Sequence, residues 1–187
     1  MLGASGLLER FGNLEEILHA DNFPISATFH TVIAGETPTT MAKSTGLGMI
    51  ESSTILNNLD PDFLLVVGDR FDVISPALSG AYMNIPIIHT MGGEVTGTID
   101  ESIRHALTKL AHIHFPATED AKHRIIKLGE DKNRVFNVGC PRMDTVKLLF
   151  DKTEDEWQND LDGLLDSGVG PIIDLTRERF LLVSQHP

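Results

Sequence analysis

The sequence predicts an α/β protein with a Rossmann-like, doubly wound parallel sheet. Short apolar runs alternate along the chain with stretches of helical spacing, which is the pattern of strand–helix–strand units. Residues 63–67, Phe-Leu-Leu-Val-Val, form a continuous apolar run that is typical of a strand buried on both faces. Glycines and acids follow such runs, at the sheet edge where doubly wound folds bind ligands.

Size and composition fit a globular protein of about one domain. The chain has 187 residues, of which 41% are hydrophobic, and a net charge of −12. This charge disfavours nucleic acid as a partner, because phosphate binding needs a basic surface. No apolar run is long enough to span a membrane and residues 1–6 do not resemble a signal peptide, so we expect a cytoplasmic location. The single cysteine, Cys140, excludes an internal disulfide.

The first third of the chain predicts a helix, a short strand and a second helix. Residues 7–20 have helical spacing, and Gly12 indicates a break or a late start. Residues 29–33 alternate as in a short strand. The Thr37-Pro38 pair predicts a capped helix start, and that helix is expected to run to about residue 59.

The rest of the chain continues the alternation. We expect strands over residues 63–67, 85–89, 113–117 and 134–138, and helices over residues 76–83, 100–111, 118–128 and 143–150. Residues 94–98 are expected to form a loop. The predicted parts are a partial N-terminal Rossmann-like domain over 1–150, an acidic helix and linker over 151–178, and the first strand of a C-terminal domain over 179–187.

Two motifs at the predicted sheet edge carry chemically useful groups. Gly68-Asp69-Arg70 follows a strand directly, where a carboxylate can act as an acid or a base and an arginine can hold a phosphate. A surface ion pair is the alternative reading, with about equal weight. Gly92-Gly93-Glu94 offers flexible backbone amides to an anion, or forms a simple turn.

The helix that begins near Asp100 adds further candidates. Acids at its start, Asp100 and Glu101, stabilise the helix dipole without any other role. Spacing of four residues pairs Asp100 with Arg104 and Glu101 with His105, as ion pairs or as a catalytic acid with an orienting cation. His112 and His114 point to one side of a strand, where packing is favoured over metal binding because no familiar ligand spacing surrounds them.

These motifs together closely resemble the hydrolysing UDP-N-acetylglucosamine 2-epimerases of the sialic-acid pathway, a branch that includes enzymes acting on UDP-diacetamido sugars. The resemblance is dense from about residue 35 to 143. It rests on these segments: Gly68-Asp69-Arg70-Phe71-Asp72, Gly92-Gly93-Glu94-Val95, Gly97-Thr98-Ile99-Asp100, Ser102-Ile103-Arg104-His105 and Lys109-Leu110-Ala111-His112.

The resemblance implies the N-terminal domain of a two-domain, glycosyltransferase-B-type fold, here truncated. It implies conversion of a UDP-N-acetyl sugar into the free 2-epimer and UDP, by elimination to a glycal and addition of water. It implies no metal and no nicotinamide cofactor. The expected partner is the UDP-sugar, without nucleic acid or membrane, and the full-length protein is expected to form a homo-oligomer.

By position, the resemblance also implies roles for individual residues. Asp69 and Asp100 match the catalytic carboxylates, and His89 matches a histidine linked to activity. Glu94 and Glu101 are further catalytic candidates. The remaining site residues are the substrate-binding Arg70, Arg104 and His186, and the supporting His105, His112 and His114.

The sequence departs from the family pattern at three positions. Met91 stands where the family has a catalytic glutamate, and a thioether cannot transfer a proton. Either Glu94 or Glu101 substitutes for it, or this copy is impaired. Val67 and Gly6 stand where histidines are usual.

The resemblance also predicts missing segments. The chain is expected to lack the family's first strand, first helix and second strand, together with most of the second domain. Unpaired strand edges and exposed apolar faces would result. We therefore expect a fragment that binds UDP poorly alone. The alternative is a non-catalytic homologue that acts as an interaction module, and a non-hydrolysing 2-epimerase fits the motifs less well.

Overall fold

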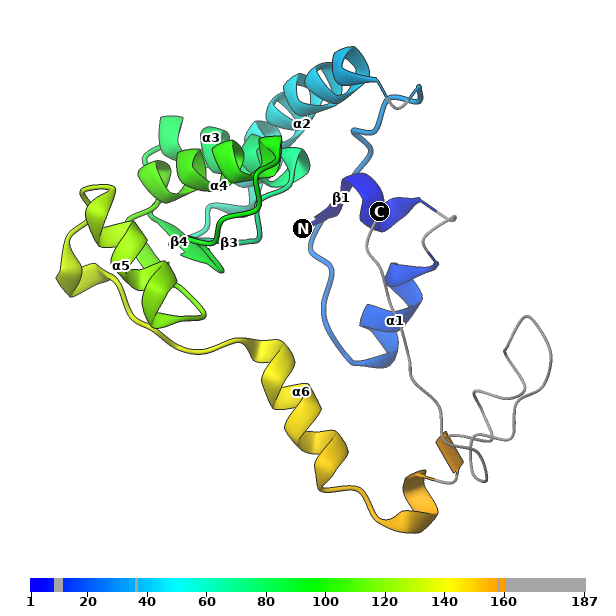
Figure 1. Cartoon of the computed structure of the whole chain (residues 1–187). Coiled ribbons are helices and arrows are strands. Elements are labelled where there is room, and N and C mark those ends of the chain that lie inside the picture. The colour runs from blue at the N-terminus through cyan, green and yellow to red at the C-terminus, as the bar shows by residue number, and fades with distance from the viewer. Residues whose placement is uncertain (9–11, 36, 158, 161–187) are drawn as a thin grey trace. The chain divides into compact units, whose positions relative to one another are not determined.

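The computed structural model describes residues 1–8, 12–35, 37–157 and 159–160 (Figure 1). The chain divides into two compact units, of which the first is Met1–Cys140 and the second begins at Pro141. The predicted strand near residue 180 and His186 lie outside the described residues.

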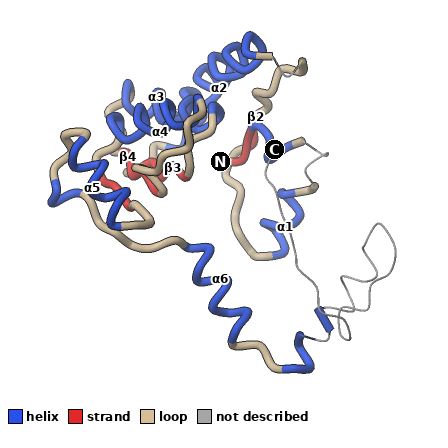
Figure 2. The backbone as a smooth tube through the Cα atoms, in the orientation of Figure 1, coloured by secondary structure: helices blue, strands red, loops and turns tan. Residues whose placement is uncertain are grey.

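Helices make up most of the regular structure and the strands are short (Figure 2). In chain order the elements are β1 (Leu2–Gly3), a 3-10 helix (Ala4–Leu7), α1 (Leu14–Ala20), β2 (Thr28–Phe29), α2 (Pro38–Leu59), β3 (Leu64–Val67), α3 (Phe71–Tyr82), β4 (Ile87–Thr90), α4 (Ile99–Leu110), β5 (Ile113–Phe115), α5 (Glu119–Lys127), a 3-10 turn (Lys132–Arg134) and α6 (Pro141–Phe150).

All strand pairs in the described residues are parallel, as predicted. β3, β4 and β5 form one sheet in that order, and β1 pairs with β2 in a second sheet. Helices α3 and α4 connect the three strands, and they pack on one side of β3 and β4 (Figure 1). The core between helices and sheet contains Leu56, Leu64, Val66, Ile74, Ala77, Ile85, Ile87, Leu107 and Ala111.

The prediction that the 63–67 strand is buried on both faces is wrong for this structure. Leu64 and Val66 face the helices and are buried, whereas Leu65 and Val67 are 57% and 62% exposed. The reason is geometric, because successive side chains of a strand point to opposite faces and the helices α2 to α4 pack on one of them. A continuous apolar run shows that both faces of a strand are hydrophobic, but it does not show which face another element covers.

The helix start signals were informative. Thr37 caps α2, with its hydroxyl accepting the Thr40 amide at 3.1 Å and its own amide donating to Thr40 Oγ1 at 2.9 Å. The late start of the first helix is confirmed, since α1 begins at Leu14. The helix expected from residue 76 begins earlier, at Phe71, and contains Pro76 within it.

The predicted strand over residues 134–138 is present only as a short pairing of its later residues with the end of β5. Arg134 instead closes a 3-10 turn, donating its amide to the Asp131 carbonyl at 2.8 Å. Val135 then forms a single parallel bridge with His114. After the turn, the amides of Phe136 and Val138 donate to the carbonyls of His114 and Pro116 at 2.9 and 3.2 Å, so the segment follows β5 without forming a regular strand.

Candidate functional site

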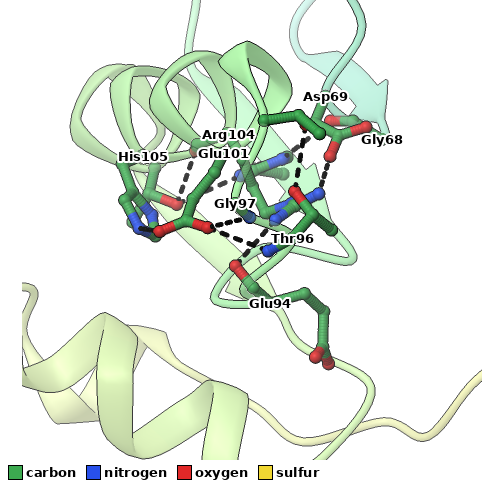
Figure 3. A network of polar contacts seen from close by, with 11 residues as sticks. Gly68, Asp69, Glu94, Thr96, Gly97, Glu101, Arg104 and His105 are labelled. Atoms are coloured by element: carbon green, nitrogen blue, oxygen red, sulfur yellow. Dashed lines mark hydrogen bonds and ion pairs between the residues drawn. The ribbon is translucent and has the colours of Figure 1, made fainter.

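Two loops at the carboxyl ends of β3 and β4 meet the start of α4 (Figure 3). The first loop turns at Gly68, whose φ of +81° is a conformation that favours glycine, and then presents Asp69. The second loop begins at Met91, which adopts the left-handed region with φ of +62° and donates its amide to the Phe115 carbonyl at 3.0 Å. The conformations of both loops therefore depend on backbone geometry as well as on side-chain contacts.

Arg104 joins the two loops. Its Nη2 forms an ion pair with the Asp69 carboxylate, and its Nη1 donates to the Glu94 carbonyl at 2.7 Å (Figure 3). Arg104 is 5% exposed, and the Asp69 side chain is 20% exposed. The expected pairing of Arg104 with Asp100, four residues earlier, is replaced by this pairing with a residue from another loop.

Glu101 holds the loop that precedes α4. Its Oε2 accepts the backbone amides of Thr96 at 2.8 Å and Gly97 at 2.7 Å. These hydrogen bonds, with that of Gly97 the stronger, lower the pKa of Glu101. The expected Glu101–His105 pairing is confirmed, with Nε2 of His105 3.8 Å from Oε1.

Glu94 contributes its backbone to Arg104 but sends its side chain elsewhere. Figure 3 shows this side chain extending away from Asp69 and Arg104. Its carboxylate accepts the hydroxyl of Thr118, at the start of α5, at 3.3 Å. Thus the two glutamates considered as substitutes at Met91 are both engaged with other groups, and neither bonds to the Asp69 carboxylate in the described structure.

The glycine pair in the second loop packs against α5. Arg124 donates to the Gly93 carbonyl at 2.9 Å. Gly93 has a φ of +81°, and a Cβ atom there would lie 2.3 Å from the carbonyl oxygen of Ala121. No other residue fits this position without moving the α5 backbone.

His89 is buried in β4, and no ionised side chain among the described residues forms a hydrogen bond with it. Its Nε2 lies 3.1 Å from the Gly68 carbonyl, and its Nδ1 lies 3.5 Å from the hydroxyl of Thr108 on α4. Burial lowers the pKa of His89 from 6.5 to about 4, so the ring is neutral near pH 7. The buried ring of His89 therefore supports the first loop through its contact with the Gly68 carbonyl.

The other two predicted histidines also have structural partners. His114 is buried beside His89 in the sheet register, and its Nε2 lies 3.4 Å from Glu130. Burial lowers the pKa of His114, and the charge of Glu130 opposes that shift. His112 accepts the backbone amide of Ile87 at 3.1 Å. His112 thus links the start of β5 to β4, and His114 links β5 to the loop that follows α5.

Asp100 and Arg70 are two further charged groups at this edge. Asp100 lies in the first turn of α4, and no described residue forms a hydrogen bond or an ion pair with its carboxylate. The Arg70 side chain is 57% exposed, with its Nε 3.6 Å from Asp72. Asp100 can therefore exchange a proton with a ligand, and Arg70 can turn toward an anion.

Three supporting residues were missed from the sequence: Thr108, Thr118 and Arg124. The one signal for Thr108 is its position four residues after Arg104, where a threonine hydroxyl can bond back to the helix. The described residues contain no cluster of three or more potential metal ligands. Within the same residues, no helix is long and apolar enough to cross a membrane.

Comparison with known proteins shows which family this chain is similar to. Residues 11–187 match the family model of UDP-N-acetylglucosamine 2-epimerase. The chain is 36% identical over 145 residues to UDP-N,N'-diacetylbacillosamine 2-epimerase (hydrolyzing) from Legionella pneumophila, covering 78% of this chain and 38% of the relative. It is 34% identical over 145 residues to GDP/UDP-N,N'-diacetylbacillosamine 2-epimerase (hydrolyzing) from Campylobacter jejuni, covering 77% and 38%.

Solved structures show the same fold. The UDP-GlcNAc 2-epimerase from Neisseria meningitidis, bound to UDP-GlcNAc, matches with a TM-score of 0.66 at 20% identity, over 82% of this chain and 43% of that one. The UDP-N-acetylglucosamine 2-epimerase from Rickettsia bellii matches with a TM-score of 0.63 at 22% identity, over 84% and 43%. These matches confirm the predicted fold class. The chain spans 38% of the length of the first two relatives, and it belongs to the UDP-N-acetylglucosamine 2-epimerase family.

Proposed function

We propose that the complete polypeptide containing this chain is a hydrolysing UDP-sugar 2-epimerase. It would convert a UDP-linked N-acetyl sugar into the free 2-epimer and UDP. Family membership and the two hydrolysing relatives support this reaction. The observation on this chain that carries the proposal is the Asp69–Arg104 pair at the carboxyl edge of the sheet, in which Arg104 is buried, one helical turn from Asp100, a carboxylate that no described residue pairs with.

The reaction needs groups that move a proton and groups that hold a diphosphate. In the elimination step a base takes the proton from C2, the C1–O bond to UDP breaks, and a C1–C2 double bond forms. Water then adds its hydroxyl to C1, and C2 receives a proton on the face opposite to the one from which the first proton was removed. We assign proton transfer to the carboxylates of Asp69 and Asp100 and contact with the diphosphate to Arg70, whose guanidinium is exposed.

Arg104 takes a different role in this proposal from the one inferred by resemblance. Both of its terminal nitrogens already bond to protein groups, one to Asp69 and one to the Glu94 carbonyl. We therefore assign Arg104 to orienting Asp69, with substrate phosphate left to Arg70. Glu101, whose carboxylate accepts two loop amides, is assigned to holding the loop that precedes α4.

A direct assay on the complete polypeptide tests the proposed function. UDP-N-acetylglucosamine and UDP-N,N'-diacetylbacillosamine are supplied separately, and UDP release and free 2-epimer are followed by NMR in deuterated water. Deuterium must appear at C2 of the product, because elimination removes the original proton. Release of UDP without deuterium at C2 would refute the elimination route, and no release from either sugar would refute the proposed function.

A second candidate function follows from Met91. The resemblance implies a glutamate where this chain has Met91, and the two candidate substitutes, Glu94 and Glu101, direct their carboxylates to Thr118 and to Thr96 instead of the Asp69 pair. This observation favours a catalytically impaired homologue. A Met91→Glu variant separates the two candidates: a gain in turnover of about 10-fold or more, typical of an added acid–base group, identifies an impaired copy. Measurable wild-type turnover that the substitution leaves unchanged identifies an enzyme that does not need this acid.

A further inference from the structure

We propose that His89 is a positioning residue that holds the Gly68 carbonyl and thereby directs Asp69 toward Arg104. The inference deepens the proposed function and rests on it, because Asp69 is one of the carboxylates assigned to proton transfer. It also changes the role of His89, which the resemblance had placed among the catalytic residues. Three features of the structure support it: a closed set of contacts, complete burial, and the protonation state of the ring.

The contacts form a closed path around Asp69. The ring of His89 bonds at Nε2 to the carbonyl of Gly68, the residue directly before Asp69. On its other side Nδ1 of the ring lies 3.5 Å from the hydroxyl oxygen of Thr108, which donates its one proton to the backbone carbonyl of Arg104 at 3.0 Å, so ring and hydroxyl are in contact without a hydrogen bond between them. The Arg104 side chain then returns to the Asp69 carboxylate. The ring of His89 therefore couples the turn that carries Asp69 to the helix that carries its partner.

Burial keeps His89 away from any bound ligand. Its relative exposure is 0%, and Gly92 of the second loop covers the ring. A Cβ atom on Gly92 would lie 3.0 Å from both Nδ1 and Cε1 of His89 and 3.2 Å from the Thr108 hydroxyl. The absence of a side chain at Gly92 lets the loop lie directly on the ring, so a substrate cannot touch it.

The protonation state removes His89 from acid–base chemistry. A carbonyl oxygen only accepts hydrogen bonds, so the proton of the neutral ring must sit on Nε2 and point to Gly68. Burial lowers the pKa of the ring to about 4, which keeps it neutral at neutral pH. A neutral ring that donates its proton to the backbone cannot serve as a general acid there.

A pair of substitutions at His89 distinguishes positioning from catalysis. Glutamine can donate from its Nε2 to the Gly68 carbonyl but cannot act as an acid or a base, and leucine can do neither. In the complete polypeptide we expect His89→Leu to lower kcat about 100-fold with KM little changed, as for a misplaced catalytic group. We expect His89→Gln to recover at least about 10-fold of that loss and to keep the wild-type shape of the pH–rate profile.

The same variants of the exposed His123 provide the control and should leave kcat unchanged. If His89→Gln is as inactive as His89→Leu while circular dichroism shows both to be folded, the positioning role is wrong. The wild-type ring gives a further check by nitrogen NMR at pH 7. A neutral ring with its proton on Nε2 supports the inference, and a charged ring or a proton on Nδ1 overturns it.

An NMR measurement on this chain separates failure of the inference from failure of the proposed function. The guanidinium of Arg104 is buried and paired, so its N–H protons should exchange slowly with water. His89→Leu should speed this exchange at least about 10-fold, and His89→Gln should retain slow exchange. Equal exchange in wild type and both variants would overturn the positioning role, whether or not the complete polypeptide proves to be an epimerase.

Discussion

Breaking the Asp69–Arg104 pair tests whether this contact couples the two loops energetically. We predict that Asp69→Asn lowers the free energy of unfolding by about 3 kcal/mol, the lower end of the cost of leaving a buried charge unpaired. The lower end applies because Arg104, though 5% exposed, keeps its bond to the Glu94 carbonyl. Arg104→Leu should lower the free energy of unfolding by about 2 kcal/mol. It leaves the Asp69 carboxylate without its partner, but this side chain is 20% exposed and can be hydrated.

The double variant Asp69→Asn/Arg104→Leu completes the cycle. If the two side chains interact directly, its cost should be smaller than the sum of the single costs by about 2 kcal/mol. Urea unfolding followed by far-ultraviolet circular dichroism measures all four proteins. The pair Glu119–Lys122, at 4.0 Å with side chains 61% and 31% exposed, is the more solvated control and should couple by less than about 0.5 kcal/mol. A coupling at Asp69–Arg104 no larger than this control would refute the reasoning.

Three further predictions concern the residues around this pair. As pH falls from about 6.5 to about 4, the unfolded His89 ring takes up a proton that the folded ring excludes, so stability is lost in that window by about 3 kcal/mol; His89→Gln should flatten this loss in urea titrations at pH 4.5 and 7.5. Gly93→Ala should destabilise by more than about 2 kcal/mol through its clash with α5, whereas Gly97→Ala, with φ of +71° and open space around it, should cost about 1 kcal/mol in thermal unfolding. Glu101→Gln should increase hydrogen exchange of the two loop amides that it holds by about 10-fold, because it removes a charged acceptor.

Local signals in the sequence predicted the local structure well. The Thr37-Pro38 pair marks the observed start of α2, because capping depends on residues within one turn. The Glu101–His105 contact followed from helical spacing in the same way. In the 134–138 segment the turn that begins at Asp131 takes Arg134, which the alternating pattern did not indicate, whereas Phe136 and Val138 pair with the end of β5 as the alternation predicted.

The partners of site residues could not be predicted, because they depend on how distant loops meet. Arg104 is four residues from Asp100 yet pairs with Asp69, 35 residues earlier. The sequence gives no reason to prefer Asp69 over Asp100 as the partner of Arg104, since this pairing depends on the turn at Gly68. Similarly, Glu94 lies near Met91 in sequence but sends its carboxylate to α5. Proximity along the chain therefore predicted more carboxylates beside Asp69 than the structure places there.

The two loops at this edge depend on each other, and this bears on how the site can vary. Arg104 requires Asp69 from the first loop and the Glu94 carbonyl from the second, while His89 requires the Gly68 carbonyl and the bare backbone of Gly92. A change in either loop therefore alters the support of the other. The side chain of Met91 stands outside this set of bonds, because only its backbone amide is engaged by a described residue. A change of side chain at this position therefore breaks none of these bonds, and we expect Met91→Glu to leave the arrangement around Asp69 intact.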